Sequence, residues 1–165
     1  MEFENNYIAW FYKENLVDFV AFSQLLDVND NLYKNNFLST PNIESGHRWL
    51  LSPWDMDMSL GGNFDGDYKD ETTWLERYIY CAPFNRLYKN NVEGFADDVW
   101  ERIVDLATSL LTVEKMDERL EAYVSLFMKS GAWERERNKW TGHPVPLKED
   151  LHDEKDYVVG WYKRN

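Results

Sequence analysis

The first strong pattern in the chain is a helical repeat of apolar residues at positions 14–27. Leu16, Phe19 and Leu26 recur close to the helical period, and little of this segment is polar. Turn-forming residues follow at 27–31. The pattern therefore predicts a deeply buried helix that ends at this turn.

Two short apolar segments come next, at residues 36–40 and 47–54. They flank Pro41 and the turn-like sequence at 44–46, so we expect them to pair as a short hairpin. The segment from 55 to 70 is rich in Gly and Asp and predicts a loop.

The second half of the chain predicts helices at 72–80, 92–111, 113–129 and 154–164, with irregular structure at 131–153 around two prolines. One apolar stripe contains Phe95, Val99, Ile103, Leu106 and Leu110, and a second contains Met116, Leu120, Tyr123 and Phe127. Thr112 is placed to cap the helix at 113–129. With one small β element and no alternating βα units, the fold class is α+β and mostly helical.

The composition and net charge exclude some classes of binding partner. The 165 residues are 44% hydrophobic, which is enough for a core, and carry a net charge of −12. That charge argues against a nucleic-acid backbone or an anionic lipid surface as partner. The single cysteine, Cys81, excludes a disulfide framework and a Cys-rich zinc site. No apolar run approaches the roughly 20 residues of a membrane span.

Asp30 and Asn35 lie in the turn after the first predicted helix, five positions apart. A protein-kinase catalytic loop has this spacing between the Asp that accepts the hydroxyl proton and the Asn that holds a magnesium ion. The spacing alone is a weak signal. Asp and Asn are common in turns, where their side chains bond the local backbone, so both interpretations stay open.

A second candidate follows the predicted hairpin, where Asp55 and Asp57 come two residues apart after Pro53-Trp54. Paired carboxylates on a loop supply hard oxygen ligands for Mg²⁺ or Ca²⁺. Gly61-Gly62 would let the backbone pass close to a ligand. The alternative is a solvated acidic loop after an edge strand.

Together, residues 15–62 resemble the CotH kinase family, the spore coat protein H type of atypical protein kinases. The similarity runs through NLVDFVAFSQLLDVNDNLYKNNFLS and HRWLLSPWDMDMSLGG. In that family a buried helix leads to an Asn-x-Asp element, an Asn before a short strand, a Trp-containing strand and a Pro-Trp-Asp signature that ends in Gly. The matching positions are Asn29, Asp30, Asn35, Asn36, Trp49, Pro53, Trp54, Asp55, Asp57 and Gly61.

The resemblance implies a role for each of these side chains. Asp30 would orient or deprotonate the acceptor hydroxyl, and Asp55 would bind the metal. Asn35 would be the second metal ligand, with Asn36 as the alternative register, and Asp57 a further ligand. The implied reaction is Mg²⁺-dependent transfer of the γ-phosphoryl group of ATP to a Ser or Thr hydroxyl of a protein.

The resemblance also implies a fold like a protein-kinase C-lobe, with a short hairpin that carries the catalytic loop and the metal-binding Asp. The segment before Asp30 contains no Gly-rich loop and no paired Lys and Glu. We therefore expect residues 1–165 to form a single domain, with the N-lobe and the extreme C-terminus of a CotH-type kinase outside it. The isolated chain is expected to bind ATP weakly and to be inactive by itself.

Two other functions remain open. WLLSPWDMDMS is similar to the apolar strand and Asp-x-Asp of a haloacid-dehalogenase-type phosphatase, with Asp55 as nucleophile and Asp57 as acid/base. That fold needs several βα units downstream, where this chain predicts helices. The other alternative is a non-catalytic pseudokinase or cell-surface interaction module. The family resemblance implies a bacterial secreted, cell-surface or spore-coat setting, and the composition does not distinguish among these.

Overall fold

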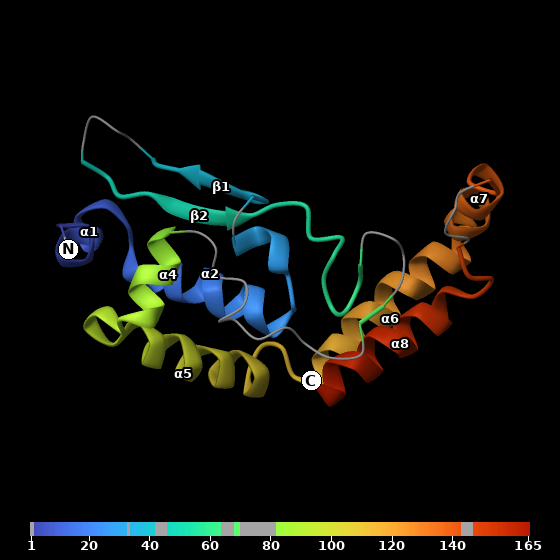
Figure 1. Cartoon of the computed structure of the whole chain (residues 1–165). Coiled ribbons are helices and arrows are strands. Elements are labelled where there is room, and N and C mark those ends of the chain that lie inside the picture. The colour runs from blue at the N-terminus through green and yellow to red at the C-terminus, as the bar shows by residue number, and fades with distance from the viewer. Residues whose placement is uncertain (1, 33, 42–45, 64–67, 70–81, 143–146) are drawn as a thin grey trace.

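The computed structural model describes residues 2–32, 34–41, 46–63, 68–69, 82–142 and 147–165. In this part the chain is mostly helical with one two-stranded antiparallel sheet (Figure 1). The elements are α1 Glu2–Trp10, α2 Lys13–Leu25, the 3-10 helix η1 Asn29–Leu32, β1 Asn36–Ser39, β2 Leu50–Pro53, α4 Ala82–Lys89, the 3-10 helix η2 Val92–Gly94, α5 Phe95–Thr108, α6 Val113–Lys129, α7 Ala132–Lys139 and α8 Leu151–Arg164. The predicted class, α+β and mostly helical, is confirmed at this level.

Most of the long predicted elements are present. The helix predicted at 14–27 is α2, and the predicted hairpin is the β1–β2 pair. The helix predicted at 113–129 is α6, which Thr112 caps by accepting the Lys115 N–H at 3.3 Å. The helix predicted at 72–80 lies outside the described residues. No described helix has both the length and the apolar character that crossing a bilayer requires.

The prediction of irregular structure at 131–153 is wrong for most of the described residues of this segment. This segment contains α7 and the beginning of α8. Pro144 and Pro146, on which that prediction rested, lie outside the described residues, and neither is part of α7 or α8. Helix α8 begins at Leu151, three residues before the predicted start at 154, and Asp150 caps it by accepting the His152 N–H at 2.9 Å. The short helix α4 was not predicted at all.

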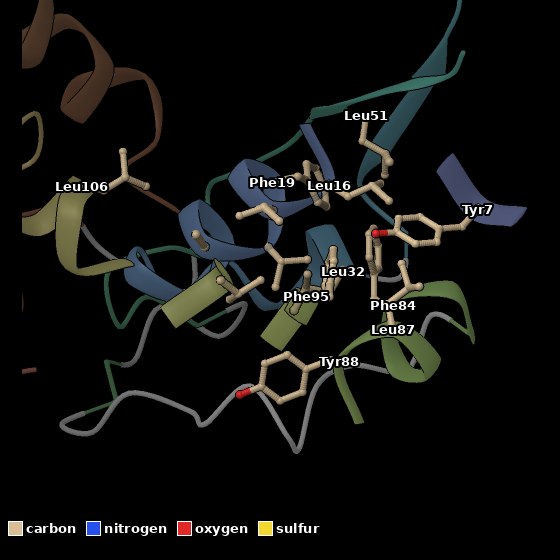
Figure 2. Packing of buried hydrophobic residues seen from close by; sticks show 14 residues of the cluster. Tyr7, Leu16, Phe19, Leu32, Leu51, Phe84, Leu87, Tyr88, Phe95 and Leu106 are labelled. Atoms are coloured by element: carbon tan, nitrogen blue, oxygen red, sulfur yellow. The ribbon is translucent and has the colours of Figure 1, made fainter. Parts of the chain in front are cut away.

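The larger core lies between α1, α2, α4 and α5 and under β2 (Figure 2). Phe19 of α2 stacks on Phe84 of α4 with ring centroids 5.8 Å apart. Phe95 and Val99 of α5 are completely buried against the same cluster. Each such side chain contributes about 1.5–3 kcal/mol relative to an exposed one, so the apolar repeat of α2 accounts for much of the stability of this half.

A second core joins the C-terminal helices to the rest of the chain. Trp161 and Tyr162 of α8 pack with Leu26 and Val28, which lie just before η1. Figure 1 shows α6 and α8 side by side, extending away from the first core. Lys155 of α8 forms ion pairs with two residues of α6, since its Nζ lies 3.0 Å from carboxylate oxygens of Glu121 and Asp117. These ion pairs raise the pKa of Lys155.

The apolar stripe predicted on α6 is only partly buried. Tyr123 is 64% exposed and Phe127 is 44% exposed, whereas Val124 is the buried residue of this helix. Among the described elements α6 packs mainly against α8, with α7 beside its C-terminal end. Because one neighbouring helix covers one side of α6, half of the predicted stripe stays at the surface.

A side chain takes the place of a third strand along β2. The side-chain Nδ2 of Asn15 donates to the main-chain carbonyl of Leu51 at 3.1 Å, and the Leu51 N–H donates to the side-chain Oδ1 of Asn15 at 2.7 Å. Leu51 is 7% exposed, so both backbone groups need protein partners. Asn15 thereby fixes β2 on α2, from which the strand leads to Trp54 and Asp55.

We expect Asn15→Ala to destabilise the fold by about 1–3 kcal/mol, because it leaves a buried N–H and a buried C=O without partners. Chemical denaturation of the two proteins measures the difference. Asn90→Ala is the matched control, since the Asn90 amide makes an exposed bond to Glu4 at 2.9 Å, and its effect should stay within about 0.5 kcal/mol. Equal losses in the two variants would contradict the role given to Asn15.

Candidate functional site

Asp30 lies in η1, where the chain turns back on itself between α2 and β1. Its main-chain oxygen accepts the N–H groups of Lys34 at 2.9 Å and Asn35 at 3.1 Å. The residue is 6% exposed, and its carboxylate Oδ2 lies 2.6 Å from Lys34 Nζ. This ion pair offsets part of the free-energy cost of placing a charged carboxylate at a nearly buried position.

Asn35 reaches from this turn to the end of β2. Its side-chain amide donates to the main-chain oxygen of Asp55 at 3.4 Å, and the Trp54 N–H donates to the Asn35 carbonyl at 3.0 Å. Asn36 is engaged differently, because its amide donates to the main-chain oxygen of Asn31 at 2.7 Å. The structure therefore brings Asn35, rather than Asn36, beside Asp55.

The backbone changes direction at Asp55, directly after β2. Asp55 has φ of 55°, a left-handed conformation that non-glycine residues seldom adopt, and it is exposed. Asp57 is also exposed, and its carboxylate Oδ1 accepts the Met58 N–H at 3.1 Å. Both acidic residues therefore follow the end of β2, so the alternation of side chains along a strand does not apply to them.

The sequence did not single out Asn31, which lies next to Asp30 inside the first candidate segment. Asn31 is completely buried, and its amide donates to the main-chain oxygens of Asn35 and, at 2.7 Å, Trp54. The segment NDNLYKNN contains four asparagines, and their order along the chain does not tell which of them turns inward.

The loop after Asp57 is fixed by main-chain bonds. The Leu60 N–H donates to the Leu26 carbonyl at 2.7 Å, and the Lys69 N–H donates to the Gly61 carbonyl at 2.7 Å. Trp161 Nε1–H of α8 donates to the Lys69 carbonyl at 2.8 Å. The turn at 26–28 and the C-terminal helix thus hold the loop that follows both acidic residues.

Gly61 is required by close packing and by its backbone conformation. Its φ is +83°, and a Cβ atom at this position would lie 2.5 Å from Trp161 Nε1 and 2.9 Å from the Lys69 carbonyl oxygen. No side chain fits there without movement of the backbone or the buried indole. This explains the glycine at the end of the Pro-Trp-Asp segment.

The described side chains near the end of β2 do not by themselves form a metal site made of protein ligands alone. In the described part of the chain, no cluster of three or more His, Cys, Asp or Glu side chains lies close enough to hold a metal. Magnesium bound with nucleotides usually takes one or two carboxylates, water and phosphate oxygens. Asp55 and Asn35, whose side-chain amide reaches the main-chain oxygen of Asp55, carry oxygen atoms of the chemical type that such a complex uses.

Comparison with protein families identifies the chain. The family described as CotH kinase protein matches residues 1–165, the whole length. The chain belongs to the CotH kinase family. No curated protein and no solved structure matches it. Membership of this kinase family agrees with the resemblance seen in residues 15–62, and it extends the match over the helical second half.

For a CotH family member, the phosphatase alternative has little structural support. The described residues after β2 form helices and one isolated bridge between Gly62 and Tyr68, without further strands. A haloacid-dehalogenase fold would need successive βα units there. The roles of Asp30, Asn35, Asp55 and Asp57 in the CotH chain remain predictions.

We expect Gly61→Ala to cost more stability than Gly46→Ala. Both glycines have positive φ, but a Cβ at Gly46 would meet nothing within 4 Å. Gly46→Ala should therefore cost about 1–2 kcal/mol, for backbone strain alone. Gly61→Ala should add about 1–3 kcal/mol for the clash with Trp161 and Lys69. Denaturation curves measure both; similar losses would show that the contact with Trp161 is unimportant.

Proposed function

We propose that this CotH family chain carries the phosphoryl-transfer site of an atypical protein kinase, which moves the γ-phosphoryl group of ATP to a Ser or Thr hydroxyl of a protein with Mg²⁺. The observation that carries the proposal is the contact between the turn at 30–35 and the end of β2, where Asn35 meets the main chain of Asp55. The turn that has the Asp30–Asn35 spacing of a kinase catalytic loop thus contacts the segment that contains Asp55.

Asp55 and Asn35 would hold the metal beside the phosphates. Magnesium at this position would neutralise the charge that the phosphates carry during transfer. That need is strong in a chain with net charge −12, because carboxylates repel a bare triphosphate. Asp57 is a weaker candidate, since one of its carboxylate oxygens already accepts the Met58 N–H.

Asp30 would orient the acceptor hydroxyl and accept its proton. Its position in η1 is fixed by two main-chain bonds and by the pair with Lys34. A base held in one position reacts with a hydroxyl that the protein substrate brings to it, and positioning of this kind supplies much of the rate in phosphoryl transfer. Asp30 therefore serves the acceptor, while Asn35 and Asp55 serve the nucleotide.

Metal-dependent nucleotide binding gives the first test. We expect Mn²⁺ with ATP to broaden the amide resonances of residues 34–36 and 54–57 selectively in an NMR titration, because Mn²⁺ shares the oxygen ligands of Mg²⁺. Asp55→Asn should weaken this effect by about tenfold or more in Mn²⁺ concentration. Asp153→Asn, which removes an exposed carboxylate from α8, is the matched control. Broadening that centres elsewhere, or that survives Asp55→Asn, would refute the assignment.

Phosphoryl transfer by the protein gives the second test. Labelled phosphate from ATP should appear on protein Ser or Thr. Asp30→Asn and Asp55→Asn should each lower the rate by about a hundredfold or more, because one removes the base and the other a metal ligand. Variants that keep full activity would remove both assignments, and nucleotide binding without any transfer would favour a non-catalytic module.

A further inference from the structure

The contact between the two candidate segments depends on one buried side chain. Asn31 lies next to Asp30 in η1 and has no exposed surface. Its amide nitrogen donates to the main-chain oxygen of Asn35 in its own turn and, at 2.7 Å, to that of Trp54 at the end of β2. One NH₂ group thus joins the residue before Asp55 to the turn that contains Asn35.

The chemistry of these contacts fixes the orientation of the Asn31 amide. Both neighbours are carbonyl oxygens, which accept hydrogen bonds, so the NH₂ group must face them. The opposite orientation would place a third oxygen against the other two. An Asp or a Leu of similar size at this position would have no N–H to donate, so the two contacts require an asparagine in particular.

Further bonds hold Asn31 itself in place. Its main-chain oxygen accepts the Asn36 amide at 2.7 Å, and its main-chain N–H donates to the Val28 carbonyl at 3.3 Å. Its side-chain oxygen is buried and has no hydrogen-bond partner among the described residues. A buried amide with an unpaired oxygen is costly, so Asn31 is poorly suited to a purely structural role.

We propose that Asn31 is a positioning residue: its amide holds Asn35 and Asp55 at the separation at which they can share one metal–nucleotide complex. The inference rests on the proposed function. Asn31 acts through the main chain of Asn35 and Trp54, so it need not touch metal, nucleotide or acceptor. Its loss should therefore weaken metal–nucleotide binding without removing any ligand atom.

The test compares Asn31→Leu and Asn31→Ser with the unchanged chain, using Mn²⁺ and ATP as probes. Asn31→Leu keeps the size but gives no N–H, and Asn31→Ser gives a donor too short to join both carbonyls. In either variant we expect the apparent affinity for Mn²⁺ with ATP to fall by about tenfold or more, as for loss of groups that orient metal ligands. The control is Val99→Ala, which weakens the larger core at a fully buried residue of α5 and removes no polar contact between the two candidate segments.

Hydrogen exchange separates the proposal from the proposed function. The Trp54 N–H, which donates to the Asn35 carbonyl, should exchange several-fold faster in Asn31→Leu. The Leu51 N–H, which Asn15 holds, should keep its protection apart from the overall change in stability. If the unchanged chain binds no Mn²⁺ with ATP, the proposed function fails, and the exchange of Trp54 alone decides whether Asn31 joins the segments. Unchanged exchange at Trp54, or Mn²⁺ affinity equal to that of Val99→Ala, would overturn the role of Asn31.

Discussion

Hydrogen bonding of asparagine side chains to the main chain of β2, and to the residue that follows it, is the constraint on which the candidate site depends. A two-stranded sheet satisfies the backbone groups of each strand on one side only, and an isolated hairpin is marginally stable. Asn15 supplies both a donor and an acceptor to Leu51, and Asn31 supplies a donor to Trp54 one residue beyond the strand. Two asparagine side chains thus fix the strand that leads to Asp55.

The two hydrophobic cores are joined at the same place. Leu25 and Leu111 pack against both clusters, and Leu26 accepts the N–H of Leu60 from the loop after Asp57. Trp161 closes the other side of this loop against Gly61. The acidic loop is therefore bound to α2 at one end and to α8 at the other, so the distant C-terminal helix contributes to the shape of the candidate site.

Helices with one-sided apolar patterns could be predicted from the sequence, and contacts made by asparagine side chains could not. The repeat through Leu16 and Phe19 identified α2, and the spacing of Asp30, Asn35 and Asp55 identified the candidate segments. The apolar stripe on α6 predicted more burial than the structure shows, and Tyr123 is exposed. Periodicity indicates which residues share a face of a helix, but not whether another element covers that face. Asn31 was missed because burial, and not residue type, distinguishes it from the asparagines around it.

The position of Asp55 follows from how the residue before it is held. The main chain of Trp54 donates to the Asn35 carbonyl and accepts from Asn31, while its exposed indole meets Phe37 of β1 edge-on, with ring centroids 5.3 Å apart. Both the backbone and the side chain of Trp54 are therefore fixed. A left-handed turn at Asp55 has a definite direction only if the preceding peptide is fixed, so the polar contacts on one side and the aromatic contact on the other together determine where the main chain turns at Asp55.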